Sequence, residues 1–575
     1  MNVTISGRYD SSNKTFRQMP SVANIAREPK NYLGVGMAEK EWNANPKLAS
    51  KKFLHTGAYH NFLNEDTLIL LGRTGTGKTS ILKCIEYSIN NKLCTDYTDV
   101  ILEDFSEIFD LLLRQDASEL ESTTMNQMKV IIDTTVITMV MIHMVKKYSE
   151  PQQLKTTKNY LTTNGLYNNK KAIGIISTIL NSFRMSSNDK ISNIYNTISD
   201  IYSFITKQLY LTYTAAKEEL IEFLSDKRVL VMFDSMNYYN MQETNEILAI
   251  KALISECFDY YIKNTYTHIY LKIALPSEVH TRILNSLPGK QQGNTVLIQW
   301  KYKELTNFVA LRLMYWLKEA KTKDYGLETE FSDQYIFEDF YLDNENAYKN
   351  SKTLLQKILP NTCPTCFLFE FDTISYCMRH TLKKPRELLM IFNALIEELI
   401  AQKNIKHFIE HPDEIKQTIH STQEIMVKSA LSMYETSFKG INEACFVALS
   451  SLEFVFTLND IKNKLKEAEQ QSKSTYDKDD ILRILFESGL VGVLNEIKHI
   501  DVPPKTFKTD APFDLIIANF EYQIKGKITA TLTDQYVIHP MCYEYYRCYV
   551  DDCSMVYPNR FADEEDIINT ILKSS

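Results

Sequence analysis

The residues best suited to chemistry form one short segment, Gly72-Arg73-Thr74-Gly75-Thr76-Gly77-Lys78-Thr79. It fits G-x-x-x-x-G-K-[ST] at every fixed position, which is the pattern of a loop that binds the phosphates of a nucleoside triphosphate. In such a loop backbone N–H groups surround the β-phosphate, Lys78 reaches the β- and γ-oxygens, and the Thr79 hydroxyl ligates Mg²⁺. We therefore expect ATP and Mg²⁺ as ligands. The predicted nucleotide-contacting residues are Gly72, Arg73, Thr74, Gly75, Thr76, Gly77, Lys78, Thr79 and Ser80.

The segments on either side of this loop are those that the motif requires. Thr67–Leu71 is a short, nearly continuous apolar run, as expected of a buried parallel strand. After the loop, apolar residues recur at helical spacing, namely Ile81, Leu82, Ile85 and Ile89. A helix that begins at the loop points its positive N-terminus at an anion. The alternative, a glycine-rich turn with an exposed lysine, does not require this context.

A second apolar run ends in an acidic residue. Val229–Phe233 is followed by Asp234, which is typical of a Walker B strand. Its aspartate would accept hydrogen bonds from magnesium-bound water or from the Thr79 shell, so Thr79 and Asp234 are the predicted metal-binding residues. The alternative is a buried strand that ends in a turn aspartate.

Composition and charge bound the class of protein. The chain has 575 residues, 44% hydrophobic and 24% charged, which is typical of globular domains. A net charge of −8 gives no overall attraction to nucleic acid or to anionic membrane. Ten scattered cysteines suit a reducing compartment, and the N-terminus lacks the basic and apolar regions of a signal peptide, so we expect a cytoplasmic protein.

Two further segments need separate interpretation. Val130–Val145 is the most apolar stretch, but it contains Asp133 and His143 and is too short to span a bilayer, which favours a buried helix and no membrane association. Cys363-Pro364-Thr365-Cys366 is a lone C-x-x-C without a second pair at zinc-ribbon spacing, so we do not predict a zinc site there.

The pattern along the chain predicts an α/β P-loop NTPase core with a parallel sheet and a helical insertion, followed by a helical lid and a C-terminal winged-helix domain. Two more strands are expected at Ile269–Leu275 and Val296–Trp300. The predicted divisions are an N-terminal arm at 1–48, the core at 49–300 with its insertion at about 105–225, the lid at 301–430 and the winged-helix-like domain at 431–575.

This order of features resembles the AAA+/STAND-related ATPases of the origin-recognition type, and more narrowly the bacterial P-loop ATPases common in phage-defence gene neighbourhoods. The segments that carry the resemblance are Gly72–Thr79, Leu230–Asp234, Leu271–Glu278, Gln299–Leu313, His380–Leu389 and Val537–Pro540. The resemblance implies an ATP-dependent switch that assembles with itself or with a separately encoded effector. The chain itself contains no nuclease, TIR-like or protease motif.

The catalytic residues depart from the pattern of these families. Hydrolysis needs a carboxylate that polarises the attacking water. Ser235 follows the Walker B aspartate where related ATPases keep a glutamate, and Asn237 and Tyr238 occupy the acidic positions of the D-x-x-D-[DE] variant. Glu243 and Glu246 lie just beyond and are the predicted substitutes. ATP binding is therefore better supported than turnover, which we expect to be slow or partner-stimulated.

The lid carries the candidate γ-phosphate sensor. Pro385 can occupy the first turn of a helix, which would let Arg386 reach the γ-phosphate in the sensor-2 role of related ATPases. The alternative is a surface arginine at a helix start. Arg312 is a further candidate that we interpret as structural. The arginine found after the third strand in related ATPases is replaced here by Pro276-Ser277-Glu278.

The C-terminal region predicts helices at Glu443–Leu449, from Thr457 and at Asp480–Glu487, with wing strands at Leu490–Leu494 and Phe520–Tyr522. After Tyr536–Pro540 a tyrosine-rich helix is expected, with His539 in the core or at a cap. A winged helix suggests DNA, but residues 428–573 contain 16 lysines and arginines against 23 aspartates and glutamates. Duplex binding relies on neutralising phosphates, so contact with protein is the preferred interpretation.

Three hypotheses remain. The first is an ATP-binding STAND/AAA+-like switch in bacterial anti-phage defence, which assembles with itself, with a separately encoded effector protein, or with both. The second is an origin-recognition-type DNA-binding regulator, which a basic patch on the folded C-terminal region would favour. The third is a nucleotide-stabilised scaffold without turnover, which Ser235, Asn237 and Tyr238 would favour.

Overall fold

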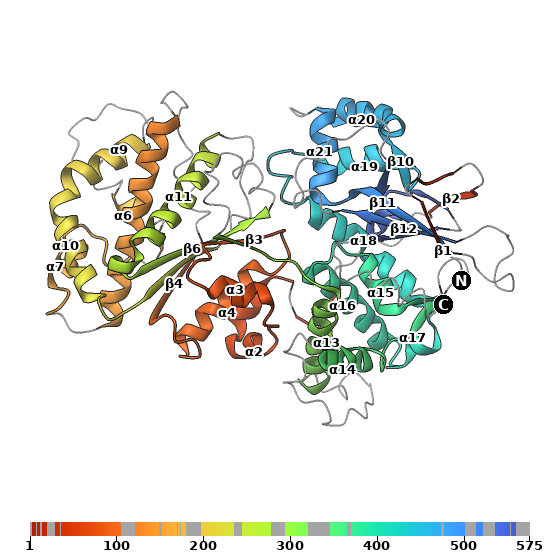
Figure 1. Ribbon diagram of the computed structural model, residues 1–575, viewed down its shortest axis with the longest axis horizontal. Helices are drawn as coiled ribbons and strands as arrows, with labels where there is room; N and C mark the ends of the chain where they lie inside the picture. Colours follow the sequence, from red (N-terminus) through yellow and green to blue (C-terminus); the bar gives the residue numbers. More distant parts are fainter. Residues whose placement is uncertain are drawn as a thin grey trace. The chain divides into compact units, whose positions relative to one another are not determined.

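The computed structural model of the chain is shown in Figure 1. It describes residues 3–6, 8–11, 14–19, 29–34, 36–104, 121–148, 152–169, 171–172, 174–179, 197–234, 244–277, 294–319, 345–364, 370–472, 477–500, 513–520, 535–551 and 554–558. The chain divides into two compact units. The central unit is Gly57–Ile298, and the terminal unit combines Met1–Thr56 with Gln299–Ser575.

The central unit is built on a parallel sheet. Its strands are β3 (Ile69–Gly72), β4 (Asp99–Asp104), β5 (Val229–Asp234), β6 (Ile269–Pro276) and β7 (Thr295–Leu297). They lie in the order β4-β5-β6-β3-β7, and every neighbouring pair is parallel. The prediction of a parallel α/β core is thus confirmed. Strand β4 was not predicted from the sequence, and β7 ends at Leu297, before the predicted Trp300.

Helices cover both faces of this sheet. In Figure 1, α3 (Gly57–Leu63) and α4 (Lys78–Asn90) lie on one side, and α6 (Glu121–Lys147) and α11 (Thr244–Thr267) lie on the other. In its described residues, the insertion between β4 and β5 is helical, as expected. Its other described elements are α7 (Lys155–Thr163), α9 (Thr197–Phe204), the π-helix η1 (Ile205–Leu209) and α10 (Tyr210–Phe223).

Helix α6 contains the most apolar stretch of the sequence. Its segment Thr124–Lys147 is long and apolar enough to cross a membrane, but 72% of its most apolar window is buried inside the protein. It packs against α9 and α11. These contacts confirm the predicted buried helix, and the segment is weak evidence for a membrane span.

In the terminal unit, the segment that begins at Gln299 is first mainly helical. Its helices are α13 (Tyr302–Glu319), α14 (Glu345–Leu355), α15 (Thr373–Arg379), α16 (Pro385–Ala401), α17 (His407–Glu410) and α18 (Glu414–Leu431), with the small strands β8 (Thr362–Pro364) and β9 (Glu370–Asp372). The short helices α1 (Ala38–Ala44) and α2 (Pro46–Lys51) belong to the same unit. The proline at the first position of α16 fits a helix start, because its missing N–H would be unpaired there anyway.

Its C-terminal part combines three helices with a mixed sheet. The helices are α19 (Ile441–Leu449), α20 (Leu458–Ser472) and α21 (Lys478–Ser488). The strands are β10 (Val455–Thr457), β11 (Val491–Ile500), β12 (Phe513–Asn519), β13 (Gln535–Ile538) and β15 (Ser554–Pro558), in the order β10-β13-β11-β12-β15. The predicted helix at Asp480–Glu487 is present as α21, which begins with an Asp477 capping box and ends at left-handed Gly489.

The sheet is larger than the two-stranded wing that we expected. Strand β12 ends at Asn519, so the predicted strand at Phe520–Tyr522 is wrong at Phe520, and Tyr522 lies outside the described residues. The tyrosine-rich helix is wrong as well. The three-residue 3-10 helix η6 (Pro540–Cys542) and strand β14 (Tyr549–Asp551) stand in its place, and Tyr543 and Tyr546 are buried.

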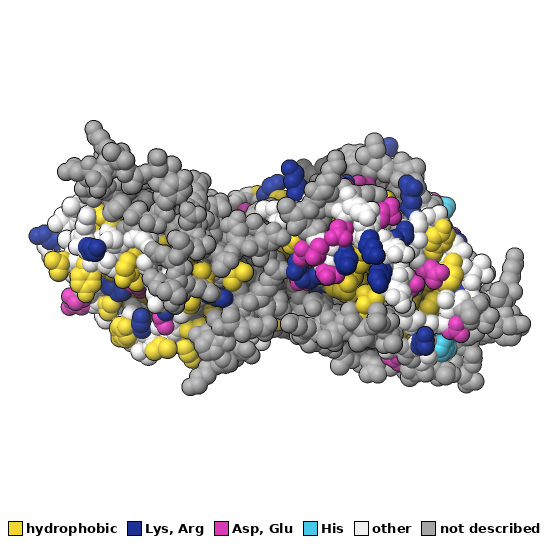
Figure 2. All heavy atoms as spheres, turned by 90° about the horizontal axis from the view of Figure 1, so that it is seen from above, with side chains coloured by type: hydrophobic (Ala, Val, Ile, Leu, Met, Phe, Trp, Pro, Cys, Tyr) yellow, Lys and Arg dark blue, Asp and Glu magenta, His cyan; other side chains and the backbone are white. Residues whose placement is uncertain are grey.

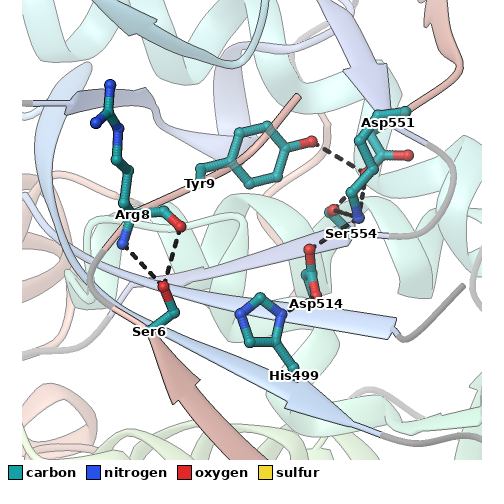
Figure 3. Close-up of polar contacts among 8 residues, drawn as sticks. Ser6, Arg8, Tyr9, His499, Asp514, Asp551 and Ser554 are labelled. Carbon is teal, nitrogen blue, oxygen red and sulfur yellow. Dashed lines mark hydrogen bonds and ion pairs between the residues drawn. The ribbon is translucent and has the colours of Figure 1, made fainter. Parts of the chain in front are cut away.

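The N-terminal arm is part of this C-terminal layer. Strand β1 (Val3–Ser6) pairs antiparallel with β11, and β2 (Phe16–Gln18) pairs antiparallel with β14. Between them, Figure 3 shows the polar cluster that Tyr9 joins: its hydroxyl donates to Asp551 Oδ2 at 3.0 Å. The Lys14 ammonium lies 2.8 Å from Asp514 Oδ2 and 3.2 Å from Asp551 Oδ2.

Candidate functional site

The glycine-rich segment forms a tight loop between β3 and α4. Gly75 has φ of 89° and Gly77 has φ of 100°, in the left-handed region that favours glycine. Gly77 is also the N-cap residue, directly before the first residue of α4. A Cβ at Gly72 would lie 2.4 Å from the Thr76 hydroxyl oxygen, which is a collision, and in tight contact with Ile298 at 3.3 Å. The structure therefore uses these glycines for backbone conformation and close approach, as the motif requires.

Lys78 is held against the backbone of the same loop. Its side chain is buried, with 4% of the residue exposed. Its Nζ donates to the carbonyl oxygen of Gly72 at 2.7 Å and to that of Arg73 at 3.3 Å. The Thr76 hydroxyl donates to the Arg73 carbonyl at 2.7 Å. These contacts keep the ammonium group at the loop rather than in solvent.

The remaining loop residues differ in exposure. Arg73 and Thr76 are buried, whereas Thr74, Thr79 and Ser80 are half-buried. Thr79 is the second residue of α4, so it lies in the first turn, where the N–H groups of the helix are unpaired and the dipole is positive. A side chain built at Gly77 would meet no atom within 4 Å, so there is open space beside the loop at this point.

Asp234 lies at the same edge of the sheet as the loop. It is the last residue of β5 and is 9% exposed. Because β3, β5 and β6 are parallel, their carboxyl ends meet at one edge. Strand β6 separates the other two, so β5 and β3 lie about 10 Å apart at two strand spacings. Asp234 and the loop that leads into α4 therefore lie at the same edge of the sheet.

The predicted water-activating residues cannot be placed. Ser235, Asn237, Tyr238 and Glu243 lie outside the described residues. Glu246 belongs to the first turn of α11, but its side chain lies outside the described part. Their predicted roles remain predictions.

Arg386 contacts the N-terminal part of its own unit. It is the second residue of α16, and its Nε donates to the Gly36 carbonyl at 2.9 Å. The Arg386 side chain also packs against Gly36: a Cβ added at Gly36 would lie 3.3 Å from Arg386 Cγ. Arg386 belongs to the terminal unit and the phosphate-type loop to the central one, so the sensor role stays a prediction.

Arg312 has a structural role. Its two terminal nitrogens bind the Glu41 carboxylate at 2.8 and 3.0 Å, and Nη1 also donates to the Leu33 carbonyl. This fork-like pairing is the strongest common geometry for an arginine and a carboxylate. His539 likewise has the expected capping role, because its Nδ1 accepts the Met541 N–H at 3.1 Å at the start of η6.

Sequence reasoning missed several buried ionisable groups. Lys272, in the middle of β6, is 1% exposed, and its burial lowers its pKa to about 7. Glu256 of α11 is also buried, which raises its pKa to about 7. Neither residue belongs to a motif, and only the packing of distant helices onto the sheet reveals them.

A cavity of about 370 Å³ lies beside the edge strand β4 and was also not predicted. Ile101, Met139 and Ile142 form part of its wall, and His143 and Lys147 lie at its polar side. These two side chains approach the buried carboxylate of Asp99, at 3.2 and 2.6 Å. Burial alone would raise the pKa of Asp99, but the hydrogen bonds from His143, Lys147 and Tyr148 hold it well below its usual range.

No protein-family model and no curated protein sequence matches this chain.

Proposed function

We propose that this protein binds ATP with Mg²⁺ through residues 72–80 and works as a nucleotide-dependent switch of the AAA+/STAND type. The observation that carries the proposal is the loop itself: a strand, two glycines at positive φ and a lysine at the first residue of a helix. Backbone N–H groups of such a loop point at an anion, and the helix dipole adds to the attraction.

The residues present fit ATP and its metal. The Lys78 ammonium, now bonded to Gly72 and Arg73 carbonyls, is close enough to exchange one of these partners for a phosphate oxygen. The Thr79 hydroxyl and the Asp234 carboxylate supply the oxygen ligands that Mg²⁺ prefers. Bound Mg²⁺ would neutralise charge on the β- and γ-phosphates. The protein's own contribution is to orient the phosphates and exclude water around a buried lysine.

Turnover, where it occurs, is slow. Ser235 replaces the carboxylate that activates water in related ATPases, and Glu243 and Glu246 are the proposed substitutes. We propose a rate well below the typical enzyme value of about 10 per second. The γ-phosphate would then act mainly by biasing conformation, with Arg386 of α16 as the proposed sensor in the lid.

The proposed partners are a second copy of the chain or a separately encoded effector, in a cytoplasmic anti-phage defence system. We further propose that α19, α20, α21 and strands β11 and β12 form the winged-helix-like part. On the face seen in Figure 2, Lys/Arg and Asp/Glu side chains are intermixed over the described surface of the terminal unit, without a single basic patch. Together with the net charge of −7 over 428–573, this mixture supports contact with protein over duplex DNA.

The test compares Lys78→Ala with wild type in thermal unfolding with and without ATP–Mg²⁺. Wild type should gain about 3 to 4 kcal/mol when ATP is present at several hundred times its Kd. Lys78→Ala should lose this gain, because the β- and γ-phosphates lack their main cation. Lys83→Ala is the matched control on the same helix, since in the described structure Lys83 pairs with Glu86, at 3.1 Å, outside the loop. Equal shifts in Lys78→Ala and wild type would rule out the site.

A further inference from the structure

Three side chains from successive helices of the terminal unit converge on one point. Glu398 comes from α16, His407 from α17 and Glu414 from α18. One oxygen or nitrogen atom from each lies within 4.8 Å of the other two. The closest pair is His407 Nε2 and Glu414 Oε2, at 2.8 Å.

The chain between α16 and α18 is folded to produce this convergence. Lys403 has φ of 52°, and the Asn404 N–H donates to the Leu399 carbonyl at 3.2 Å, so the chain reverses after α16. The Asn404 side chain then accepts the Lys406 N–H at 2.9 Å, just before α17 begins. The reversal places the C-terminal turn of α16 next to the first residue of α18, and a helix of four residues presents His407 between them.

In the described part of the chain, the two carboxylates of this cluster have no lysine or arginine as ion-pair partner. Glu398 Oε1 accepts a hydrogen bond from Gln402 Nε2 at 2.7 Å, and Glu414 is bonded to His407. His407 is bonded to Glu414, its nitrogen lies within 4.8 Å of a Glu398 oxygen, and its ring lies 5.1 Å from that of His411. His407 is 6% exposed, whereas 41% of the Glu414 side chain is exposed, so the cluster is buried on one side and open to solvent on the other.

We propose that Glu398, His407 and Glu414 form a Zn²⁺ site that joins α16 to α18. Carboxylate oxygens and an imidazole nitrogen are ordinary zinc ligands, at about 2.0 to 2.2 Å from the metal. In a tetrahedral site such ligands lie about 3.3 Å from each other. The His407–Glu414 pair needs to open by about half an ångström to reach this spacing. Water would complete the coordination on the exposed side.

The donor set also selects the kind of metal. Mg²⁺ and Ca²⁺ take oxygen ligands, so the central imidazole disfavours both. Thiolate ligands, which would select softer ions, do not belong to the set. The Gln402 side chain holds the Glu398 carboxylate in position, as outer hydrogen bonds do in known metal sites. A plain His–Glu hydrogen bond would use only His407 and Glu414, and it gives Glu398 no role.

Glu398 therefore provides the decisive variant. Full-length protein is stripped of metal with a chelator, freed of nucleotide and titrated with Zn²⁺ in buffer that contains excess Mg²⁺, which fills oxygen-only sites. We expect wild type to bind one Zn²⁺ per chain and Glu398→Gln to bind it at least about tenfold more weakly. Glu398 is half-buried and the substitution keeps its shape, so the metal-free melting temperature should not change.

Glu410→Gln is the matched control. Glu410 lies on α17 with His407, but its carboxylate accepts a hydrogen bond from Asn404 Nδ2 at 2.8 Å and does not belong to the cluster. The Glu410→Gln variant should bind Zn²⁺ with the affinity of wild type. Substitution by Co²⁺ should give visible absorption without the thiolate charge-transfer band that binding at a cysteine such as Cys94 would produce. Absence of stoichiometric Zn²⁺ in wild type, equal affinity in Glu398→Gln, or a thiolate band would each overturn the proposal.

Discussion

At the scale of single residues, Lys272 shows how burial sets charge. Its Nζ donates to the carbonyls of Phe62 and Asn64, both at 2.6 Å, at the end of α3. Burial is the main cause that lowers its pKa to about 7, and the charge of Asp66 partly opposes it. A neutral amine still has two N–H groups, which is the number needed for these two carbonyls.

This shift predicts a pH dependence of stability with a definite sign. Between about pH 7 and 10.5 the unfolded chain keeps the proton of Lys272, while the folded chain releases it. The unfolded state binds more protons in this window, so the free energy of unfolding should rise with pH, by at most about 1.4 kcal/mol per pH unit. Below pH 7 this contribution should be flat.

The measurement is urea unfolding at pH 7 and pH 9 for wild type and Lys272→Met. Other groups titrate in the same range, so the informative quantity is the difference between the two proteins. The rise with pH should be smaller in Lys272→Met by the contribution of one group. Identical pH profiles would show that Lys272 is not shifted as described.

At the scale of elements, the loop between β3 and α4 tests whether its glycines are required by conformation. Gly77 has φ of 100°, and an added Cβ would meet no atom within 4 Å. Gly77→Ala should therefore destabilise the protein through backbone strain alone, by about 1 to 2 kcal/mol. Chemical unfolding without nucleotide measures this cost.

Gly57→Ala is the control for this prediction. A Cβ at Gly57 also meets nothing within 4 Å, but Gly57 is the first residue of α3 and does not have a positive φ of this kind. Alanine there should be neutral or slightly stabilising. Equal costs for the two substitutions would mean that φ is not what selects glycine at Gly77.

The elements that sequence patterns predicted are those whose evidence is local. The loop, the strands that end at Gly72 and Asp234, and the buried helix α6 can all be recognised within one window of sequence. Strand β4 was missed because Asp99-Val100-Ile101-Leu102-Glu103-Asp104 has only three apolar residues between acids. The tyrosine-rich segment after Pro540 was misread as a helix because aromatic residues also favour strands and turns that pack inward.

The same limit applies to the candidate sites. The phosphate-type loop has a fixed spacing, whereas Glu398, His407 and Glu414 are spaced by the length of a turn and a short helix. That spacing has no motif, and the cluster exists only because Lys403 and Asn404 reverse the chain. The hydrogen bonds of Lys272 depend in the same way on tertiary structure, because they need the end of α3 to lie beside β6.

At the scale of the whole chain, the two ends of the sequence build one layer. Val3 pairs with Ile500 in the larger sheet, and Phe16 pairs with Asp551 in a separate two-stranded sheet, so both pairings join residues that are about 500 positions apart in sequence. No local pattern can reveal such a pairing, which is why the sequence predicted only an N-terminal arm at 1–48. In the structure, β1 instead pairs with β11 of the larger sheet, and β2 forms the two-stranded sheet with β14.

Lys14 is the charged link in this layer. Its ammonium contacts Asp514 and Asp551, whose side chains are 5% and 1% exposed, and Figure 3 shows the surrounding group of polar side chains. Burial alone would lower the pKa of Lys14, but the hydrogen bond and charge of Asp514, with those of Asp551, raise it overall. His499 Nδ1 lies 2.6 Å from the other oxygen of Asp514, so the network is closed around two buried carboxylates.

Lys14→Met should destabilise the protein far more than a surface substitution does. The methionine keeps most of the side-chain volume but leaves two buried carboxylates without their main cation, which typically costs about 3 to 5 kcal/mol. Arg17→Met is the matched control, because Arg17 lies on strand β2 of the same arm but is exposed, and exposed charged groups contribute no more than about 1 kcal/mol. Urea unfolding of both variants measures the difference. If Lys14→Met were as stable as Arg17→Met, the arm would be held by its strand pairing alone, and the buried charges would contribute nothing to its attachment.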